Sequence, residues 1–86
     1  MDIANRVTLE RKKHLLEDAH YRYNFDRQVY FNREAKKAFS VEFIEDHPPS
    51  VLENCLFEPT DGSEWRFYFN SPPSESVRRQ VEISLG

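Results

Sequence analysis

The chain has 86 residues, a formal net charge of −3 and one cysteine, which is room for one small domain spanning 1–86. A single cysteine excludes a disulfide framework within the chain and fits a reducing, cytoplasmic location. No apolar run approaches the ~20 residues that cross a bilayer, and the first residues carry no apolar signal segment, so neither membrane insertion nor secretion is expected.

The first segment predicts a helix over about 2–19, because it contains neither proline nor glycine and several of its opposite charges are spaced four residues apart. Its apolar residues form only a weak stripe, in which Leu9, Leu16 and Ala19 fall together on a helical wheel. We expect this helix to dock through its C-terminal half, and a position at the periphery of the domain is the alternative.

Alternation of apolar and polar residues begins after this helix and indicates strands. A half-buried strand is predicted over about 27–32, with 21–25 as an extended lead-in and a bend or bulge near Asp26. The polar segment 32–37 is typical of a hairpin loop, with Asn32 suited to open the turn. A second, antiparallel strand is then predicted from the alternating residues Phe39, Val41 and Phe43.

The second half of the chain predicts a helix, a strand and another helix. The proline pair 48–49 ends the preceding strand and is compatible with the first turn of a helix. The apolar residues that share one face of this helix are Val51, Leu52, Cys55 and Leu56. The third strand is predicted from Trp65, Phe67 and Phe69, and the last helix from Val77, Val81 and Leu85.

These elements predict an α+β fold in the order α-β-β-α-β-α. The sheet is expected to be three-stranded and mixed, because the first two strands form an antiparallel hairpin and the third follows a connection long enough for a crossover. The helices are expected to pack mainly on one face of the sheet. That face is predicted to carry Phe39, Phe43, Trp65, Phe67 and Phe69.

Sequence motifs for chemistry are absent. Two glycines are too few for a dinucleotide fingerprint or a P-loop, and the zinc and redox patterns HExxH and CxxC do not occur. The adjacent Glu45, Asp46 and His47 are metal-capable, but neighbours on an extended chain point to opposite sides, which favours a polar strand exit in which Asp46 or His47 caps the next helix. Cys55 falls on an apolar helix face, where a thiol behaves as a small hydrophobe. We therefore predict no catalytic residue, no cofactor and no metal site, and a protein that is not an enzyme.

Protein interaction is the leading functional hypothesis. The sheet face opposite the helices is predicted to present Tyr30, Glu42, Ile44, Arg66 and Tyr68, and tyrosine and arginine dominate interface energetics. The alternatives are that the first helix covers this face or that the face is simply solvated. Residues 1–37 hold nine Lys/Arg against six Asp/Glu (+3), and residues 38–86 hold three against nine (−6), which permits self-association. The prediction is a small protein-interaction or accessory module, with itself as one candidate partner.

Nucleic-acid binding is the alternative function. The candidate patch consists of Arg27, Arg33, Lys36 and Lys37, on and near the predicted hairpin. Tyrosines nearby in the sequence supply rings that can stack on bases. Against this hypothesis stands the overall acidity of the chain, with a pI of about 5.6, since nucleic-acid-binding domains usually carry a basic footprint.

Overall fold

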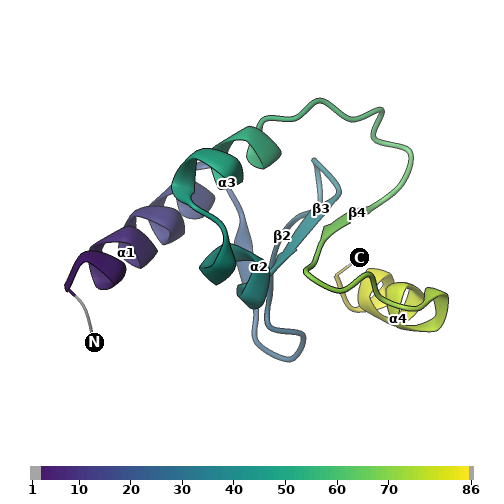
Figure 1. Ribbon diagram of the computed structural model, residues 1–86. Coiled ribbons are helices and arrows are strands. Elements are labelled where there is room, and N and C mark those ends of the chain that lie inside the picture. Colours follow the sequence, from purple (N-terminus) through teal and green to yellow (C-terminus); the bar gives the residue numbers. More distant parts are fainter. Residues whose placement is uncertain (1–2, 86) are drawn as a thin grey trace.

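The computed structural model describes residues 3–85, which form helices on both sides of a mixed four-stranded sheet (Figure 1). The elements in chain order are α1 (Ile3–Asp18), β1 (Arg22–Asn24), β2 (Val29–Asn32), β3 (Lys37–Ser40), α2 (Val41–Asp46), α3 (Pro49–Leu56), β4 (Arg66–Tyr68) and α4 (Glu75–Leu85). The predicted α+β class and mixed sheet are confirmed, but the predicted number of three strands is wrong. The predicted helix start at residue 2 lies outside the described residues. No helix within 3–85 is long and apolar enough to span a membrane.

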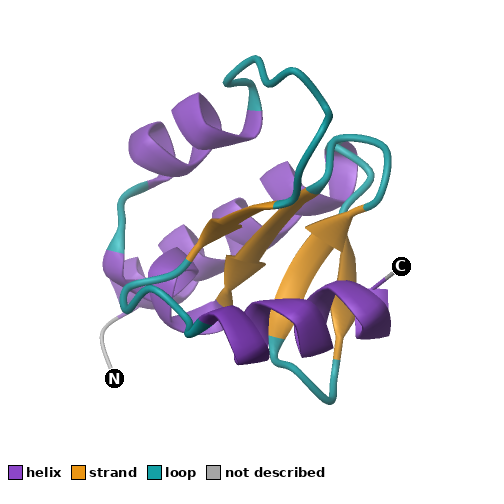
Figure 2. Cartoon of the chain, turned by 90° about the vertical axis from the view of Figure 1, so that its right-hand side faces the viewer, coloured by secondary structure: helices purple, strands orange, loops and turns teal. Residues whose placement is uncertain are grey.

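The strands lie in the order β1-β2-β3-β4, antiparallel for the first two pairs and parallel between β3 and β4. Figure 2 shows α4 in front of the sheet and the other helices behind it. Side chains of α1, α2 and α3 pack with Phe39 of β3, whereas Val81 and Leu85 of α4 pack with Val29 and Ala38 on the opposite face. Three of the four described helices thus share one face, as predicted for most of them, whereas α4 covers the other face.

The fourth strand arises from the predicted lead-in, because the expected bend is a complete hairpin turn. The side-chain Oδ1 of Asn24 accepts a hydrogen bond from the N–H of Arg27 at 2.8 Å, and Gln28 closes the turn with a φ of 53°. The next hairpin repeats this arrangement, since Asn32 Oδ1 accepts from the N–H of Ala35 at 3.0 Å and Lys36 has a φ of 54°. Asparagine side chains commonly nucleate turns in this way. The predicted role of Asn32 is confirmed.

The predicted strand through Val41 and Phe43 is wrong, because the chain turns into α2 directly after Ser40. The Ser40 hydroxyl accepts a hydrogen bond from the N–H of Phe43 at 3.1 Å and caps the first turn of the helix. An N-cap bond of this kind satisfies a backbone donor that a helix end leaves free. In the helical conformation Ile44 is 3% exposed and joins the core.

The register of the sheet decides which side chains share a face. Tyr30 of β2 lies opposite Phe39 of β3, which in turn lies beside Tyr68 of β4. Because the side-chain period of a strand is two, this register places Phe39 on the face opposite Phe67. The prediction that Phe39 and Phe67 share one helix-covered face is therefore wrong.

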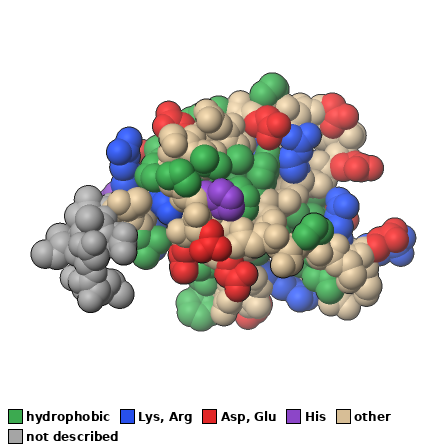
Figure 3. All heavy atoms as spheres, viewed as in Figure 1, with side chains coloured by type: hydrophobic (Ala, Val, Ile, Leu, Met, Phe, Trp, Pro, Cys, Tyr) green, Lys and Arg blue, Asp and Glu red, His purple; other side chains and the backbone are tan. Residues whose placement is uncertain are grey.

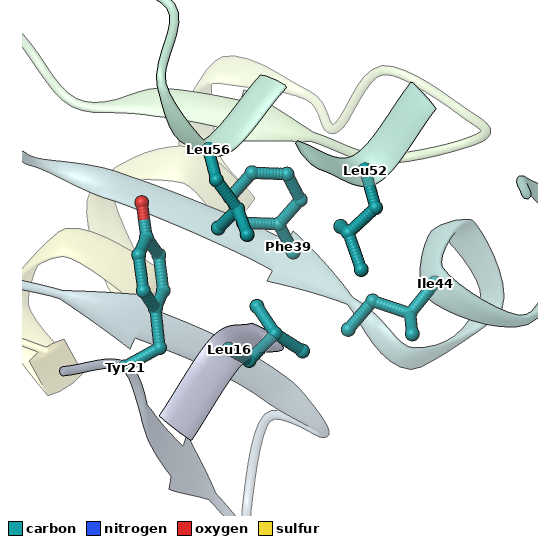
Figure 4. Packing of buried hydrophobic residues seen from close by; sticks show 6 residues of the cluster. All are labelled: Leu16, Tyr21, Phe39, Ile44, Leu52 and Leu56. Carbon is teal, nitrogen blue, oxygen red and sulfur yellow. The ribbon is translucent and has the colours of Figure 1, made fainter. Parts of the chain in front are cut away.

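Phe39 is the centre of the main core. Its side chain is fully buried, and Figure 4 shows it among Leu16, Leu52 and Leu56, with Tyr21 to one side. Its ring stacks on that of Tyr68 with centroids 4.4 Å apart and meets Tyr21 edge-on at 5.5 Å. These contacts join α1 and α3 to the middle of the sheet.

The helix α1 is followed by a residue in the left-handed backbone conformation. The N–H of Tyr21 donates to the carbonyl of Leu16 at 2.9 Å, and the N–H of His20 donates to that of Glu17 at 3.0 Å. This pair of bonds is the Schellman motif, and its residue in the left-handed region is His20, with a φ of 66°. The core contact between Leu16 and Tyr21 is the apolar contact that usually accompanies the motif.

Replacing His20 with glycine is expected to raise the free energy of unfolding by about 0.5–1 kcal/mol, because glycine adopts a positive φ without a steric penalty. Urea denaturation followed by circular dichroism measures the change. The matched control is His14→Gly, at an exposed position inside α1, which should lower stability by about 1 kcal/mol. Destabilisation by both substitutions would contradict the assignment of His20 as the cap.

Candidate functional site

The predicted nucleic-acid patch includes Lys37, which the structure buries beneath α3. Its side chain is 3% exposed, and Nζ donates hydrogen bonds to the backbone carbonyls of Cys55, Leu56 and Glu58 at 2.9, 3.0 and 2.6 Å. These carbonyls lie at and just beyond the C-terminal end of α3, where the helix dipole favours a cation. Burial lowers the pKa of Lys37, and the nearby Glu58 partly opposes this shift. Lys37 is therefore a structural residue.

Lys12 of α1 binds the C-terminal end of α2 in the same manner. It is 5% exposed, and its Nζ donates to the carbonyls of Ile44 at 2.6 Å and Glu45 at 3.2 Å. Burial lowers its pKa, and the carboxylates of Asp46 and Glu45 act in the opposite direction. The last turns of both helices of the crossover are thus held by a buried lysine from another element.

The remaining cations of the predicted patch do not form one surface with Lys37. Arg27 lies in the turn between β1 and β2, whereas Arg33 and Lys36 lie in the turn at the opposite end of β2. The Arg33 Nε donates to the carbonyl of Leu85 at 2.7 Å and so holds the last turn of α4. Figure 3 shows Lys and Arg side chains scattered over the visible face rather than gathered in one patch. The structure therefore does not bring the four predicted cations together on one surface.

The residues of the predicted protein-interaction face do not share one surface. Ile44 is buried in α2, and Tyr30 and Tyr68 are half-buried against the core beneath the helices. Glu42 is exposed on α2, and Arg66 is exposed on β4. These residues are separated because the segment carrying Glu42 and Ile44 is a helix rather than a strand, and because α1, α2 and α3 cover this side of the sheet.

Arg66 and Tyr68 nevertheless meet in a small polar cluster with Glu58. The Tyr68 hydroxyl donates to Glu58 Oε2 at 2.8 Å, and Arg66 Nη1 lies 3.1 Å from the same oxygen. These two hydrogen bonds lower the pKa of Glu58. Burial, followed by the bond to Glu58, raises the pKa of Tyr68 to about 12. The cluster ties the loop after α3 to β4, and its exposed ion pair adds little stability by itself.

The candidate metal ligand His47 and the candidate nucleophile Cys55 both make contacts within the fold. His47 ends α2, with its Nδ1 2.9 Å from the carbonyl of Phe43 and its ring stacked on Phe43 at 4.0 Å, so the prediction that it caps the next helix is wrong. Within residues 3–85, no three His, Cys, Asp or Glu side chains are grouped to hold a metal ion. Cys55 is half-buried on α3, and burial raises the pKa of its thiol, which keeps it protonated.

An aromatic groove lies along β4, on the α4 side of the sheet. Trp65, Phe67 and Phe69 occupy alternate positions, are all half-buried, and have ring centroids 6.4 and 5.4 Å apart. The guanidinium of Arg78 on α4 lies 5.3 Å from the Phe67 ring centroid, in cation–π range. The groove is lined by these four residues together with Pro72 and Pro73 and parts of the preceding loop.

The backbone beside this groove is an open sheet edge. β4 is the last strand of the sheet, and it pairs only with β3 among the described residues. The N–H of Arg66 donates inward to the carbonyl of Lys36 at 2.8 Å. Because backbone groups alternate in direction along a strand, the N–H and C=O of Phe67 point away from β3. Natural edges are often blocked by charges, prolines or bulges, but the aromatic run 65–69 contains only one charged residue, Arg66.

The opposite edge of the sheet differs in character. β1 carries Arg22 and Asn24 beside Tyr23, and its aromatic neighbour Phe25 is 84% exposed in the turn. Tyr23 contacts Phe25 and Tyr30 with ring centroids 5.6 and 5.0 Å apart. These rings form a cluster at a hairpin tip. The groove beside β1 is lined mainly by polar side chains, among them Glu17, Arg22 and Asn32.

One buried polar atom in the main core has no hydrogen-bond partner, the hydroxyl of Tyr21. Tyr21→Phe is expected to raise the free energy of unfolding by about 1 kcal/mol, because it removes an unsatisfied buried group. Burial also raises the pKa of Tyr21, so the folded protein keeps this proton above about pH 10, where the unfolded chain loses it. The stability of the wild type should therefore fall as the pH rises above 10, and less steeply in Tyr21→Phe.

Urea denaturation at pH 8 and at alkaline pH measures both effects. Tyr23→Phe is the control, since its ring is 41% exposed and the loss of its hydroxyl should change stability by under about 0.5 kcal/mol. A lower stability of Tyr21→Phe at pH 8 would show that the hydroxyl has a partner in solution.

No protein-family model, curated protein or solved structure matches this chain. The candidate functional site of the described chain is the β4 edge with its aromatic groove, which Trp65, Phe67, Phe69 and Arg78 line.

Proposed function

We propose that this protein is a small, non-enzymatic protein-interaction module that binds an extended segment of a protein partner as an added strand on β4. The observation that carries the proposal is the open backbone of Phe67 directly beside the aromatic groove. Strand addition uses these two elements together, since the main chain supplies hydrogen bonds and alternate side chains supply specificity.

The side chains of the groove suit a strand with apolar residues at alternate positions. Trp65, Phe67 and Phe69 stand on the same face of β4 and remain half-exposed, although large aromatic rings gain most from burial. Arg78 rests on Phe67 and supplies a polar rim. Aromatic and arginine side chains are enriched at the centres of protein interfaces.

The nucleic-acid alternative is not supported by the placement of its residues. Of the four predicted cations, Lys37 is buried and Arg33 holds the end of α4. The rings of the β4 groove are accompanied by the acidic residues Asp61 and Glu64, which lower the affinity of such a surface for a phosphate backbone.

A peptide array tests the proposal. The labelled full chain is applied to nine-residue peptides that carry aromatic or aliphatic residues at alternate positions, and to scrambled versions of the same composition. Binding to a subset of the alternating peptides is expected, together with its loss in the variant Phe67→Glu. Ile83→Glu is the matched control, because Ile83 is 81% exposed on α4. Absence of binding to every peptide at a concentration where the chain is monomeric, or equal binding by Phe67→Glu, would overturn the proposal.

A further inference from the structure

We infer that the strand which pairs with β4 is β4 of a second copy of this chain, related by a two-fold axis that passes beside Phe67. This inference rests on the proposed function, since it names the partner of the same edge. The segment Trp-Arg-Phe-Tyr-Phe at 65–69 supports this inference, because an aromatic residue lies two positions from Phe67 on either side.

Antiparallel pairing about Phe67 matches like with like on the groove face. Phe67 faces Phe67 of the second copy. Trp65 of each copy faces Phe69 of the other copy. Aromatic pairs across neighbouring strands are favourable. The half-exposed rings of the two grooves would thus cover each other and form a continuous aromatic row across the axis.

The same register also satisfies the backbone. The outward N–H and C=O groups belong to every second residue, which includes Phe67 and its neighbours at 65 and 69. In an antiparallel pair, residues whose backbone groups face each other exchange two hydrogen bonds, so positions 65, 67 and 69 would meet as bonded pairs. The carbonyl of Trp65 already accepts a hydrogen bond from Nη2 of Arg78 at 3.5 Å, and its second lone pair is the one available to the new strand. The two sheets then join into one, which removes the exposed edge from both copies.

Charge complementarity on the opposite face favours the same partner. The register places Arg66 opposite Tyr68 of the second copy, whose hydroxyl donates to a Glu58 carboxylate in its own chain. Each arginine is therefore brought towards a second carboxylate and an aromatic ring. Both arrangements are favourable for a guanidinium.

Sedimentation equilibrium of the full chain measures the association. The mass is expected to rise with concentration from 10.3 kDa towards twice that value. Phe67→Glu places two like charges across the axis and should raise the dissociation constant by about 100-fold or more. Ile83→Glu, outside the interface, should leave the constant within about two-fold of the wild type.

Spin labels identify the paired edge without altering the core. In a Cys55→Ser background, a label at Arg66→Cys should lie under about 20 Å from its symmetry mate, because position 66 is one residue from the axis. A label at Arg22→Cys on β1 should lie about 34 Å from its mate, since seven strand spacings separate the two outer edges. Both positions are exposed, so the labelled chains should fold as the wild type does.

The outcomes separate the two proposals. A dimer with a short distance at position 66 supports the inference, and a dimer with the short distance at position 22 overturns it by locating the interface at β1. A chain that stays at 10.3 kDa at all concentrations also overturns it. If that monomer still binds alternating peptides in the array, the proposed function stands and only the identity of the partner is wrong.

Discussion

Phe39→Ala is expected to lower the free energy of unfolding by about 3–5 kcal/mol, which is the largest effect of any single substitution considered. The side chain is fully buried at the centre of the core, where it contacts the rings of Tyr21, Phe43 and Tyr68. Alanine would leave a cavity between the sheet and the helices that neighbouring side chains can fill only in part. A domain of this size has few other contacts to compensate for the loss.

Chemical denaturation of Phe39→Ala beside Phe57→Ala checks this expectation. Phe57 undergoes the same change in chemistry but is 69% exposed, so its replacement should cost under about 0.5 kcal/mol. Equal effects of the two substitutions would contradict the placement of Phe39 at the centre of the core.

Lys37→Met is expected to lower the free energy of unfolding by about 3 kcal/mol, although it replaces a buried charge by an apolar side chain of similar length. The ammonium group donates to three backbone carbonyls at the end of α3, and methionine leaves these acceptors buried without a donor. The cost of desolvating the cation, which lowers its pKa, offsets only part of this loss.

The matched control is Lys36→Met, because Lys36 is the neighbouring residue and is only half-buried in the hairpin turn. Its replacement should change stability by under about 0.5 kcal/mol. Hydrogen exchange adds a local measurement, since the last turn of α3 should exchange faster in Lys37→Met. A variant as stable as the wild type would show that the carbonyls find other donors.

Much of the fold follows from local patterns in the sequence. The stripe of Val77, Val81 and Leu85 predicts α4, and the proline pair followed by Val51 and Leu52 predicts α3. The turn opened by Asn32 is also a local feature, because its side chain bonds to the backbone of the same loop. These elements need no information from distant parts of the chain.

The errors arise where two local patterns compete. Phe39, Val41 and Phe43 alternate as in a strand, but Ser40 is a good N-cap and opens a helix at Val41. The aromatic residues at odd positions before residue 32 suggest one face of a single strand, but the four-residue turn after Asn24 reverses the chain within that run. Tyr23 therefore pairs with Tyr30, and the odd-numbered residues of β1 and β2 lie on opposite faces of the sheet.

The buried lysines and the candidate functional site are harder to predict because both depend on the topology of the whole sheet. The buried roles of Lys12 and Lys37 require long side chains to reach helix ends more than fifteen residues away in sequence. The alternation around Phe67 predicts a strand, but only the strand order shows that this strand is an open edge. The groove likewise requires α4 to place Arg78 beside β4.

Hydrogen exchange of the Phe67 amide tests most directly the proposal that the outer edge of β4 is the docking surface of this protein. In the dilute chain this N–H is expected to exchange rapidly, and on association it should slow by about ten-fold or more as it enters a new ladder bond. Equal exchange of the Phe67 amide in the dilute and the associated protein, with protection appearing instead at β1 or on a helix, would contradict the claim.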